Sequence, residues 1–466
     1  MLNTAFRFAS VNLDPRANGP NYPQMVKDLA EDDTSRVNFL KACLSKLGLI
    51  IGQEASSSVP SLSRLHLSSL HHYLVPELLA SWDDAGIITK ENGEEYIKGE
   101  NDTFHLEKLD SRWSLNHLVK SLPLPGALKG EELLADNVDA PSDDRIVDYN
   151  AITKRLIPHE ADWPGTKETP YFNHHSFYAN LKRYQEERGS EAEEFGRYVM
   201  YGEVVTSTNT LLEKNSKLLS NLPTGFTATA TTQVAGRGRG SNVWVSPAGC
   251  LIWSVCMKHP MELSNIAPVV FIQYLAAIAI VEGIQSYDKG YENVAVKLKW
   301  PNDIYARDPS KPDEKAFVKI GGILVNSSYS SGSYDLVVGI GLNTTNALPT
   351  TSLNALLPSN LAPFTLEKLL ARILTKFETI YKSFCRTGFD AALEKIYYKH
   401  WLHTDQIVTL EQEGGARARI KGISSNWGLL RAEELGWEDR PTGKVWELQS
   451  DSNSFDFFKG LLKTKT

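Results

Sequence analysis

Cysteine is scarce in this chain. Its 466 residues contain four cysteines, Cys43, Cys250, Cys256 and Cys385. They are too few and too scattered for a disulfide framework, and no Cys-x-x-Cys pair is present. Free thiols are typical of a reducing compartment, so we predict a cytoplasmic protein.

Long hydrophobic runs are also lacking. The most apolar segment, 266–281, is interrupted by Pro268 and Gln273, and it is short for a membrane span. We predict that it forms a buried helix and that the protein has no membrane partner. The first twelve residues lack the apolar core of a secretory signal.

An excess of positive charge is the third feature that is missing. The net charge is −7 and the isoelectric point is near 5.9. General nucleic-acid binding favours a basic face, so no nucleic-acid partner is expected. The hydrophobic content of 42% and charged content of 23% are those of a globular protein, and the length predicts two or three domains.

Several familiar catalytic motifs are absent from the sequence. It contains neither GxxxxGK[ST] nor Gly-x-Ser-x-Gly, which argues against a P-loop and against an α/β-hydrolase elbow. The run 339–344 lacks the third glycine of a dinucleotide fingerprint. The histidine pairs have no further ligands at metal spacing, so we interpret them as core or surface residues, and metal ligands stay unassigned. These pairs are His71-His72, His174-His175 and His400-x-x-His403.

What is present divides the chain into three regions by texture. Residues 1–190 mix short helical patterns with Ser-, Pro- and Asp-rich stretches, 191–402 hold dense strand and helix signals, and 403–466 consist of short strands and turns. Alternation in the middle region predicts strands at 226–232, 294–300, 319–326 and 334–343, the last two as a hairpin. Helical spacing predicts helices at 211–219 and at 366–384, the latter behind a Thr365 cap. We therefore predict an α+β fold with a mixed sheet, a small C-terminal β-barrel and an N-terminal mixed region.

The most informative stretch is the glycine-arginine run at 231–240, which reads TTQVAGRGRG. Glycine allows the backbone to approach a ligand closely, and arginine supplies paired donors for carboxylate or phosphate. The pattern fits an anion-binding loop, a flexible basic loop or an RGG-like nucleic-acid segment, and the acidic net charge weakens the last interpretation.

Four further segments accompany this loop. The run 206–209 clusters hydroxyl and amide groups before a helix, which fits either a helix cap or a grip on a polar head group. The run 299–303, KWPND, ends a strand in a turn with flanking charges, and 319–325 begins a strand with a lysine and two glycines. The run 339–343, GIGLN, places an amide at the end of the next strand.

Taken together and in this order, these segments resemble the biotin protein ligases, also called holocarboxylase synthetases, of the fungal type. The matching segments are EVVTSTNTLLEKN, TTQVAGRGRGSNVW, KLKWPNDIY, KIGGILV and GIGLN, between residues 203 and 343. The resemblance implies a biotin/lipoate ligase-like catalytic domain at 191–402 and a C-terminal domain at 403–466. It also implies that 1–190 holds the end of an amidotransferase-like domain and a linker domain.

The family resemblance implies a two-step reaction. The biotin carboxylate attacks the α-phosphate of ATP, with Mg²⁺ on the phosphates, to give biotinyl-adenylate and pyrophosphate. A lysine of a biotin-carrier domain then attacks the adenylate and releases AMP. The implied acceptors are biotin-dependent carboxylases such as acetyl-CoA carboxylase and pyruvate carboxylase.

The resemblance also assigns roles to individual residues. It implies a biotin site made of Ser207, Thr208, Asn209, Gln233, Gly236, Arg237, Lys319 and Gly322. It implies an ATP site made of Arg237, Gly238, Arg239, Trp244, Asn302, Lys319 and Asn343. The implied catalytic residues are Arg237, Arg239, Lys319 and Asp303, with Asp303 orienting or deprotonating the acceptor lysine.

The chain departs from the family pattern in two places. After Arg239 it reads GSNVW, which is less basic than in many bacterial members, and no winged-helix domain precedes the catalytic region. Repressor activity is therefore not expected. Two alternatives remain: a lipoate ligase or octanoyltransferase of the same fold, and a non-catalytic biotin-binding protein.

Overall fold

A computed structural model describes most of the chain. The described residues are 61–108, 148–187, 189–240, 242–308, 310–311, 316–347, 351–449, 453–456 and 461–464. All of them belong to one compact unit, Pro60–Thr466. Cys43 and the other residues before 61, in the region where the resemblance implies the end of an amidotransferase-like domain, lie outside the described residues.

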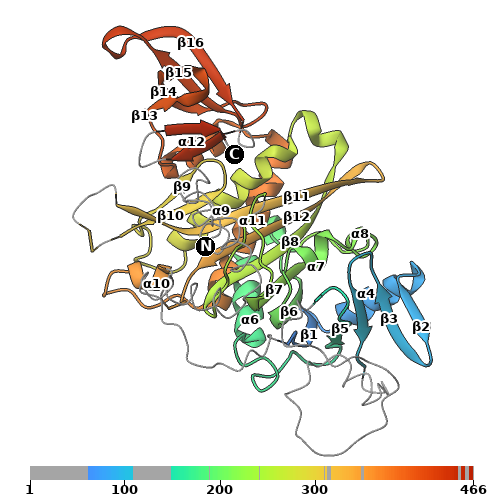
Figure 1. Ribbon diagram of the computed structural model, residues 1–466. Coiled ribbons are helices and arrows are strands. Elements are labelled where there is room, and N and C mark those ends of the chain that lie inside the picture. Colours follow the sequence, from blue (N-terminus) through green and yellow to red (C-terminus); the bar gives the residue numbers. More distant parts are fainter. Residues whose placement is uncertain are drawn as a thin grey trace, which may run out of the picture. The chain divides into compact units, whose positions relative to one another are not determined.

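The described part of the chain is built on a twelve-stranded mixed sheet (Figure 1). Three neighbouring pairs are parallel, namely β4 with β5, β1 with β5 and β6 with β7, and the other pairs are antiparallel. The predicted mixed sheet is therefore confirmed. Across the sheet the strands are β2 (Ile88–Glu91), β3 (Glu94–Lys98), β4 (Thr103–Leu106), β5 (Lys154–Pro158), β1 (Leu65–Ser69), β6 (Tyr198–Val205), β7 (Thr227–Gln233), β8 (Cys250–Pro260), β12 (Ser333–Asn343), β11 (Phe317–Ser330), β10 (Asp303–Arg307) and β9 (Val296–Lys299).

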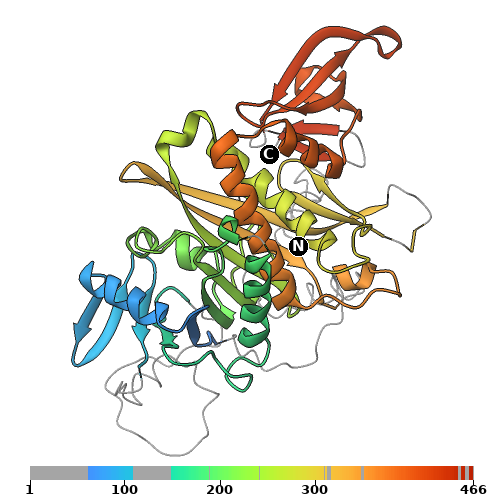
Figure 2. The same cartoon turned by 180° about the vertical axis from the view of Figure 1, so that it is seen from behind.

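Helices cover this sheet, and Figure 2 shows the long helix α11 in front of it beside α6 and α9. The α-helices are α4 (Leu74–Asp84), α6 (His174–Glu186), α7 (Thr210–Glu213), α8 (Ser216–Leu219), α9 (Ile272–Gln285), α10 (Leu353–Leu356), α11 (Leu366–Thr387) and α12 (Ala391–His400). Short 3-10 helices are η1 (Gly189–Glu191), η2 (Met261–Asn265), η3 (Val269–Phe271), η4 (Glu411–Glu413) and η5 (Trp437–Asp439).

The predicted buried helix is confirmed as α9, whose apolar side chains lie in the core on nearly every face. Among the described residues no helix is both long enough and apolar enough to cross a membrane. The predicted helix at 366–384 is confirmed as α11. Thr365 stands at the predicted N-cap position, but its hydroxyl pairs with the Tyr287 hydroxyl at 3.3 Å and makes no side-chain capping bond.

The predicted single helix at 211–219 is interrupted, and the side chain of Asn215 explains the break. Asn215 is fully buried between α7 and α8, and its Oδ1 accepts hydrogen bonds from the backbone nitrogens of Asn101 and Asp102. Its Nδ2 donates to Asp102 and to the carbonyl of Leu211. Such side-chain bonds to the backbone compete with a continuous helix. They also join this segment to the connection between β3 and β4.

A buried carboxylate connects α11 to the loop that leads into β6. Glu378 accepts hydrogen bonds of 2.8–3.0 Å from the backbone nitrogens of Glu193, Glu194 and Phe195, and it pairs with Lys382 at 2.8 Å. Its side chain is only 1% exposed. Because β6 runs directly into the 206–209 segment, this anchor fixes the start of the strand that carries candidate site residues.

We expect Glu378→Gln to lower the free energy of unfolding by about 2–3 kcal/mol, because the amide presents a donor to backbone donors and leaves buried N–H groups unsatisfied. Urea denaturation followed by circular dichroism measures this change. The matched control is Glu191→Gln, which removes an exposed pair with Arg386 and should cost less than about 1 kcal/mol. Equal losses in the two variants would contradict the anchoring role.

The C-terminal strands form a second sheet of six strands (Figure 1). In spatial order they are β16 (Pro441–Leu448), β15 (Leu430–Leu435), β14 (Ala416–Ile423), β13 (Ile407–Leu410), β18 (Leu461–Thr464) and β17 (Asn453–Asp456). The prediction of a small C-terminal β-barrel is confirmed as to a small β-structure, in which β13 and β14 pair as an antiparallel hairpin. Within the described residues β16 and β17 stand at the two ends of the strand order, so the pairing is that of an open sheet.

Candidate functional site

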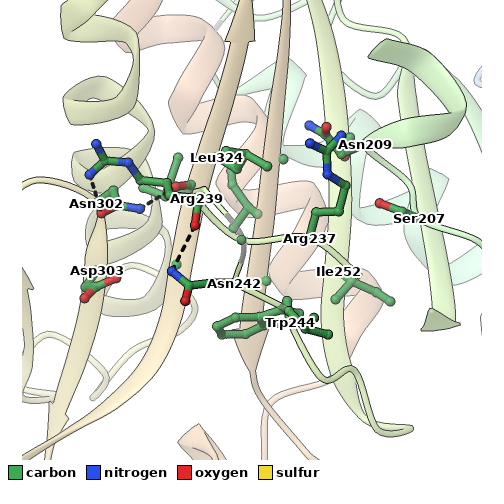
Figure 3. Close-up of a pocket in the computed structure, with 18 of the residues that line it drawn as sticks. Ser207, Asn209, Arg237, Arg239, Asn242, Trp244, Ile252, Asn302, Asp303 and Leu324 are labelled. Atoms are coloured by element: carbon green, nitrogen blue, oxygen red, sulfur yellow. Dashed lines mark hydrogen bonds between the residues drawn. The ribbon is translucent and has the colours of Figure 1, made fainter. Parts of the chain in front are cut away.

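A cavity of about 500 Å³ opens where β7, β8, β11 and β12 meet the glycine-arginine loop and the β9–β10 turn. It collects nearly all the residues that the sequence predicted for the site (Figure 3). Those lining it are Ser207, Thr208, Asn209, Gln233, Arg237, Gly238, Arg239, Trp244, Asn302, Asp303, Lys319 and Gly322. Gly236 and Asn343 are the two predicted residues that do not line it.

One end of the cavity carries uncharged polar groups from the segment before α7. Gln233 Oε1 accepts from the backbone nitrogen of Thr208 at 2.8 Å, and its Nε2 donates to Ser246 at 2.9 Å. The Thr208 hydroxyl lies 3.0 Å from that of Ser254. Gln233 therefore holds Thr208 in place with bonds that already occupy its own amide.

Asn209 differs from Ser207 and Thr208 because its side-chain amide has no hydrogen-bond partner among the described residues. Its side chain is buried, yet neither Oδ1 nor Nδ2 makes a hydrogen bond. Asn209 precedes α7 at the cap position and makes no side-chain cap bond, so capping does not account for it. A buried amide left unsatisfied costs about 1–3 kcal/mol unless a ligand or water meets it.

Two glycines of β12 make room for the side chains that face the cavity. A Cβ added at Gly339 would lie 2.9 Å from Asn209 Nδ2, and one added at Gly341 would collide with the indole of Trp244. In the GIGLN run, Gly339 and Gly341 are therefore positions where a side chain larger than hydrogen would not fit. The sequence analysis singled out the run without giving these glycines a role.

The glycine-arginine loop folds back on itself as a short hairpin. Trp244 N donates to the Gly236 carbonyl at 2.9 Å, and Gly238 N donates to the Asn242 carbonyl at 2.9 Å. A Cβ at Gly236 would collide with the Trp244 carbonyl. Gly236 therefore permits close packing of the two arms of the hairpin and lies outside the cavity lining.

The two arginines of the loop extend in different directions (Figure 3). Arg237 extends toward Asn209, and its Nη1 lies 3.4 Å from the carboxylate of Glu213. Arg239 extends the other way, and its Nη1 donates to Asn302 Oδ1 at 3.5 Å. One loop thereby supplies a guanidinium to each end of the cavity.

The other end of the cavity is defined by charge. Asp303 pairs with Lys319 at 2.7 Å and with Lys299 at 3.5 Å. With Arg237 and Arg239, four cationic side chains and a single carboxylate line the cavity. Such an excess of positive charge in a concave site attracts and concentrates anions. Lys299 was recognised in the sequence as part of a charged turn but was not predicted as a site residue.

The turn at 300–303 joins this charged end to the sheet. Asn302 Nδ2 donates to the Ile323 carbonyl at 2.8 Å, and Ile323 N donates to the Asn302 carbonyl at 2.9 Å. The Trp300 side chain is only 1% exposed, and the Trp300–Pro301 peptide is cis. These reciprocal bonds fix the Asn302 side chain beside Arg239.

Asn343 lies away from these groups. It is buried at the end of β12, and its Oδ1 accepts a hydrogen bond from the Cys250 thiol at 3.1 Å. Within the described ranges no group of three or more histidine, cysteine, aspartate or glutamate side chains is placed to hold a metal ion.

The sequence analysis did not predict several residues that also line the cavity. Ser254 supports Thr208, and Asn242 Nδ2 donates to the Arg239 carbonyl at 2.9 Å. Asn242 lies two residues after the glycine-arginine run, so its place in the sequence gave a usable signal. Ser254 lies inside an apolar strand, where only the folded sheet reveals its orientation.

Two family models match the chain. The model described as "Biotin/lipoate A/B protein ligase family" matches residues 201–343, and "Biotin-protein ligase, N terminal" matches residues 1–69. The first match covers the stretch that contains every lining residue named above.

Individual relatives extend the match beyond this stretch. A biotin–protein ligase of Schizosaccharomyces pombe is 41% identical over 283 residues, which are 58% of this chain and 44% of that protein. Among solved structures, the biotin protein ligase from Aquifex aeolicus in complex with biotin and ATP is 22% identical, with a TM-score of 0.42, over 57% of this chain and 98% of its own. Biotin–protein ligase 2 of Arabidopsis thaliana is 36% identical over 283 residues, 58% of this chain and 78% of that protein.

The chain thus spans less than half of the S. pombe relative but more than two thirds of the Arabidopsis relative. At this identity and coverage, the chain belongs to the biotin–protein ligase family.

Proposed function

We propose that this protein is an ATP-dependent biotin–protein ligase that forms biotinyl-adenylate and transfers the biotinyl group to a lysine of a carrier domain. One observation carries the proposal: a single cavity joins an end with neutral polar groups, an unsatisfied amide and one arginine to an end lined by Arg239, Lys299 and Lys319. Biotin has a neutral cyclic urea at one end and a carboxylate at the other, and ATP adds further negative charge.

The end with the neutral polar groups is the proposed site for the urea ring. The free Oδ1 and Nδ2 of Asn209 match a ligand group that both donates and accepts hydrogen bonds. Ser207 and Thr208 lie beside it, and Gln233 is proposed to act by fixing Thr208. Gly322 is proposed to leave space for the ligand in the cavity wall, and Gly236 to let the two arms of the glycine-arginine loop pack closely.

We expect Asn209→Ala to raise the biotin Kd about 10- to 100-fold, because two hydrogen bonds in a buried place are lost. Isothermal titration with biotin alone measures the effect without turnover. The control Asn221→Ala changes a half-buried asparagine outside the cavity, whose Nδ2 donates to the Lys217 carbonyl and the Ser220 hydroxyl. Unchanged biotin affinity in Asn209→Ala would refute the assignment of the urea site.

The charged end is proposed to hold the reacting oxygens. A carboxylate and a triphosphate repel each other as they approach, so fixed cations at their oxygens lower the barrier. Lys319 and Arg239 are proposed to neutralise the α-phosphate, and Arg237, which extends toward Asn209 at the other end, is proposed to bind the biotin carboxylate. Trp244 and Asn302 are proposed to contact the nucleotide, with Gly238 allowing close backbone approach. Asn343, behind this surface, is proposed to support the nucleotide site indirectly through Cys250.

The chemistry then balances in two steps. A carboxylate oxygen of biotin bonds to the α-phosphorus while the bond to the β-bridging oxygen breaks, and pyrophosphate leaves. The acceptor lysine nitrogen next bonds to the acyl carbon, the bond to the phosphate oxygen breaks, and AMP leaves. Asp303, at the cavity surface between two lysines, is proposed to orient the acceptor amine or take its proton.

Magnesium is proposed to enter on the ATP phosphates. Asp303 is the one carboxylate in the cavity lining, and it is already paired with Lys319. Mg²⁺ often keeps several waters and binds through substrate phosphates together with one or two carboxylates, which suits this lining.

The wider setting is also a proposal. Carrier domains of acetyl-CoA carboxylase and pyruvate carboxylase are the proposed acceptors, and the cytoplasm is the proposed compartment. The described cysteines Cys250, Cys256 and Cys385 are free thiols, which supports a reducing environment. We keep 191–402 as the proposed catalytic domain, 403–466 as the C-terminal domain and 1–190 as an N-terminal region.

The direct test is incubation of the protein with biotin, ATP, magnesium and a carrier domain, followed by mass measurement of the carrier. Gain of one biotinyl group with equimolar AMP supports the proposal. Pyrophosphate release with lipoate in place of biotin would favour a lipoate ligase, and biotin binding without AMP formation would favour a non-catalytic binding protein.

A further inference from the structure

The backbone of the β9–β10 turn is held by a histidine from the start of the C-terminal region. Trp300 N donates to His403 Nε2 at 3.0 Å, and the other ring nitrogen, Nδ1, lies 3.2 Å from Gln406 Oε1. Since Gln406 Oε1 can only accept, Nδ1 carries the proton and Nε2 offers its lone pair. His403 is fully buried. The pair of histidines at 400 and 403 that the sequence analysis set aside thus includes one residue directly behind the site.

The environment of His403 keeps its ring neutral. Burial lowers its pKa to about 3, and the nearby charge of Lys299 acts in the same direction. A protonated ring would have no acceptor for the Trp300 N–H. Around neutral pH the ring is therefore in the form that this hydrogen bond requires.

A second contact holds the side chain of the same tryptophan. Trp300 Nε1 donates to the Tyr274 hydroxyl at 3.1 Å, and that hydroxyl donates to the Gly428 carbonyl at 2.7 Å. Gly428 has a φ of +60°, and a Cβ there would lie 2.6 Å from the Tyr274 ring. The C-terminal region therefore meets Trp300 at both its backbone and its indole.

We propose that His403 is a positioning residue for the adenylation site, acting through the backbone nitrogen of Trp300. This inference rests on the proposed function. Trp300 lies between Lys299 and the Pro301-Asn302-Asp303 run, so its backbone orientation sets where the charged pair and the Asn302 amide point. His403 itself is not among the residues that line the cavity.

Two isosteric variants separate this role from simple packing. In His403→Gln the side-chain amide reaches the place of Nε2, so an acceptor for Trp300 N–H is retained. In His403→Asn the amide occupies the place of Nδ1, so the contact with Gln406 is retained and the acceptor for Trp300 is lost. Both variants remove the imidazole from the same buried place, but His403→Asn also leaves the buried Trp300 N–H without an acceptor, so it should melt below His403→Gln.

The experiment measures biotin-dependent pyrophosphate release and thermal unfolding for the full-length wild type and both variants. At a temperature well below both melting temperatures, where both variants are fully folded, we expect His403→Asn to lower kcat at least tenfold and His403→Gln to stay within about threefold of wild type. Rescue of kcat by the glutamine variant is a result that a purely structural role does not produce.

Equal kcat in the two variants at a temperature where both are fully folded would overturn the positioning role while the proposed function stands. Absence of biotin-dependent pyrophosphate release in the wild type would overturn the proposed function, and this inference with it.

Discussion

Lys319→Ala is expected to lower the rate of biotinyl-adenylate formation at least 100-fold while the fold stays intact. Lys319 lies at the start of β11 with its Nζ 2.7 Å from Asp303 and its side chain 44% exposed toward the cavity. Its loss removes a cation from the place where two anions must meet, and losing one such group typically costs about 3–4 kcal/mol in the transition state.

The stability of this variant should change little. Lys299 remains 3.5 Å from Asp303, so the carboxylate keeps a counter-charge after Lys319 is removed. A lysine this exposed contributes little to the free energy of unfolding. Thermal melting within a few degrees of wild type is therefore expected alongside the loss of activity.

The measurement is single-turnover formation of biotinyl-adenylate, followed by pyrophosphate release at saturating ATP and biotin. Lys297→Ala is the matched control, because Lys297 lies on β9 with its Nζ bonded to the Lys399 carbonyl and does not line the cavity. Near-normal pyrophosphate release by Lys319→Ala would refute its catalytic assignment and would point to Lys299 as the principal cation.

The parts of the fold that the sequence predicted are those with strong local patterns. Alternation identified the β11–β12 hairpin, and helical spacing identified α11, because each pattern records which face is buried. The break between α7 and α8 depends on Asn215 meeting the backbone of residues 101–102, more than one hundred positions earlier. No local pattern contains that contact.

For the candidate site, too, the local motifs could be predicted from the sequence and the contacts between distant residues could not. The loop, the WPND turn and Lys319 were recognisable as motifs, and the fold brings them to one cavity. Whether a motif residue faces the cavity was not visible in the sequence. Asn343 and Gly236 belong to the motifs but do not line the cavity. Asn343 pairs with Cys250, and Gly236 packs against the backbone of Trp244.

Residues that act from behind the site were the hardest to predict. His403 carries no motif, and its partner Trp300 is separated from it by more than a hundred residues. Its contribution arises only when α12 and β13 bring the C-terminal region against the β9–β10 turn. Sequence spacing indicated that His403 is no metal ligand, but it could not indicate what the ring does contact.

Arg239→Gly is the second change for which we expect a large effect, and here the intermediate should escape. Arg239 extends toward Asn302 on the charged side of the cavity, and its backbone carbonyl is held by Asn242 (Figure 3). Without the guanidinium, the adenylate phosphate loses a paired donor that closes the loop over it. Adenylate should still form, because Lys319 and Arg237 remain, but its release into solution should rise about 10- to 100-fold.

The release is measured as biotinyl-adenylate in the filtrate after ultrafiltration, and as biotin on lysines of an unrelated bystander protein such as serum albumin. Arg239→Lys is the matched comparison: it keeps the charge but not the fork of donors, so an intermediate release is expected. Should Arg239→Gly retain its adenylate as tightly as wild type, the loop would not be the barrier to release. The glycines of the loop would then be needed for substrate entry, and Trp244 and the β9–β10 turn would be the groups that close the site.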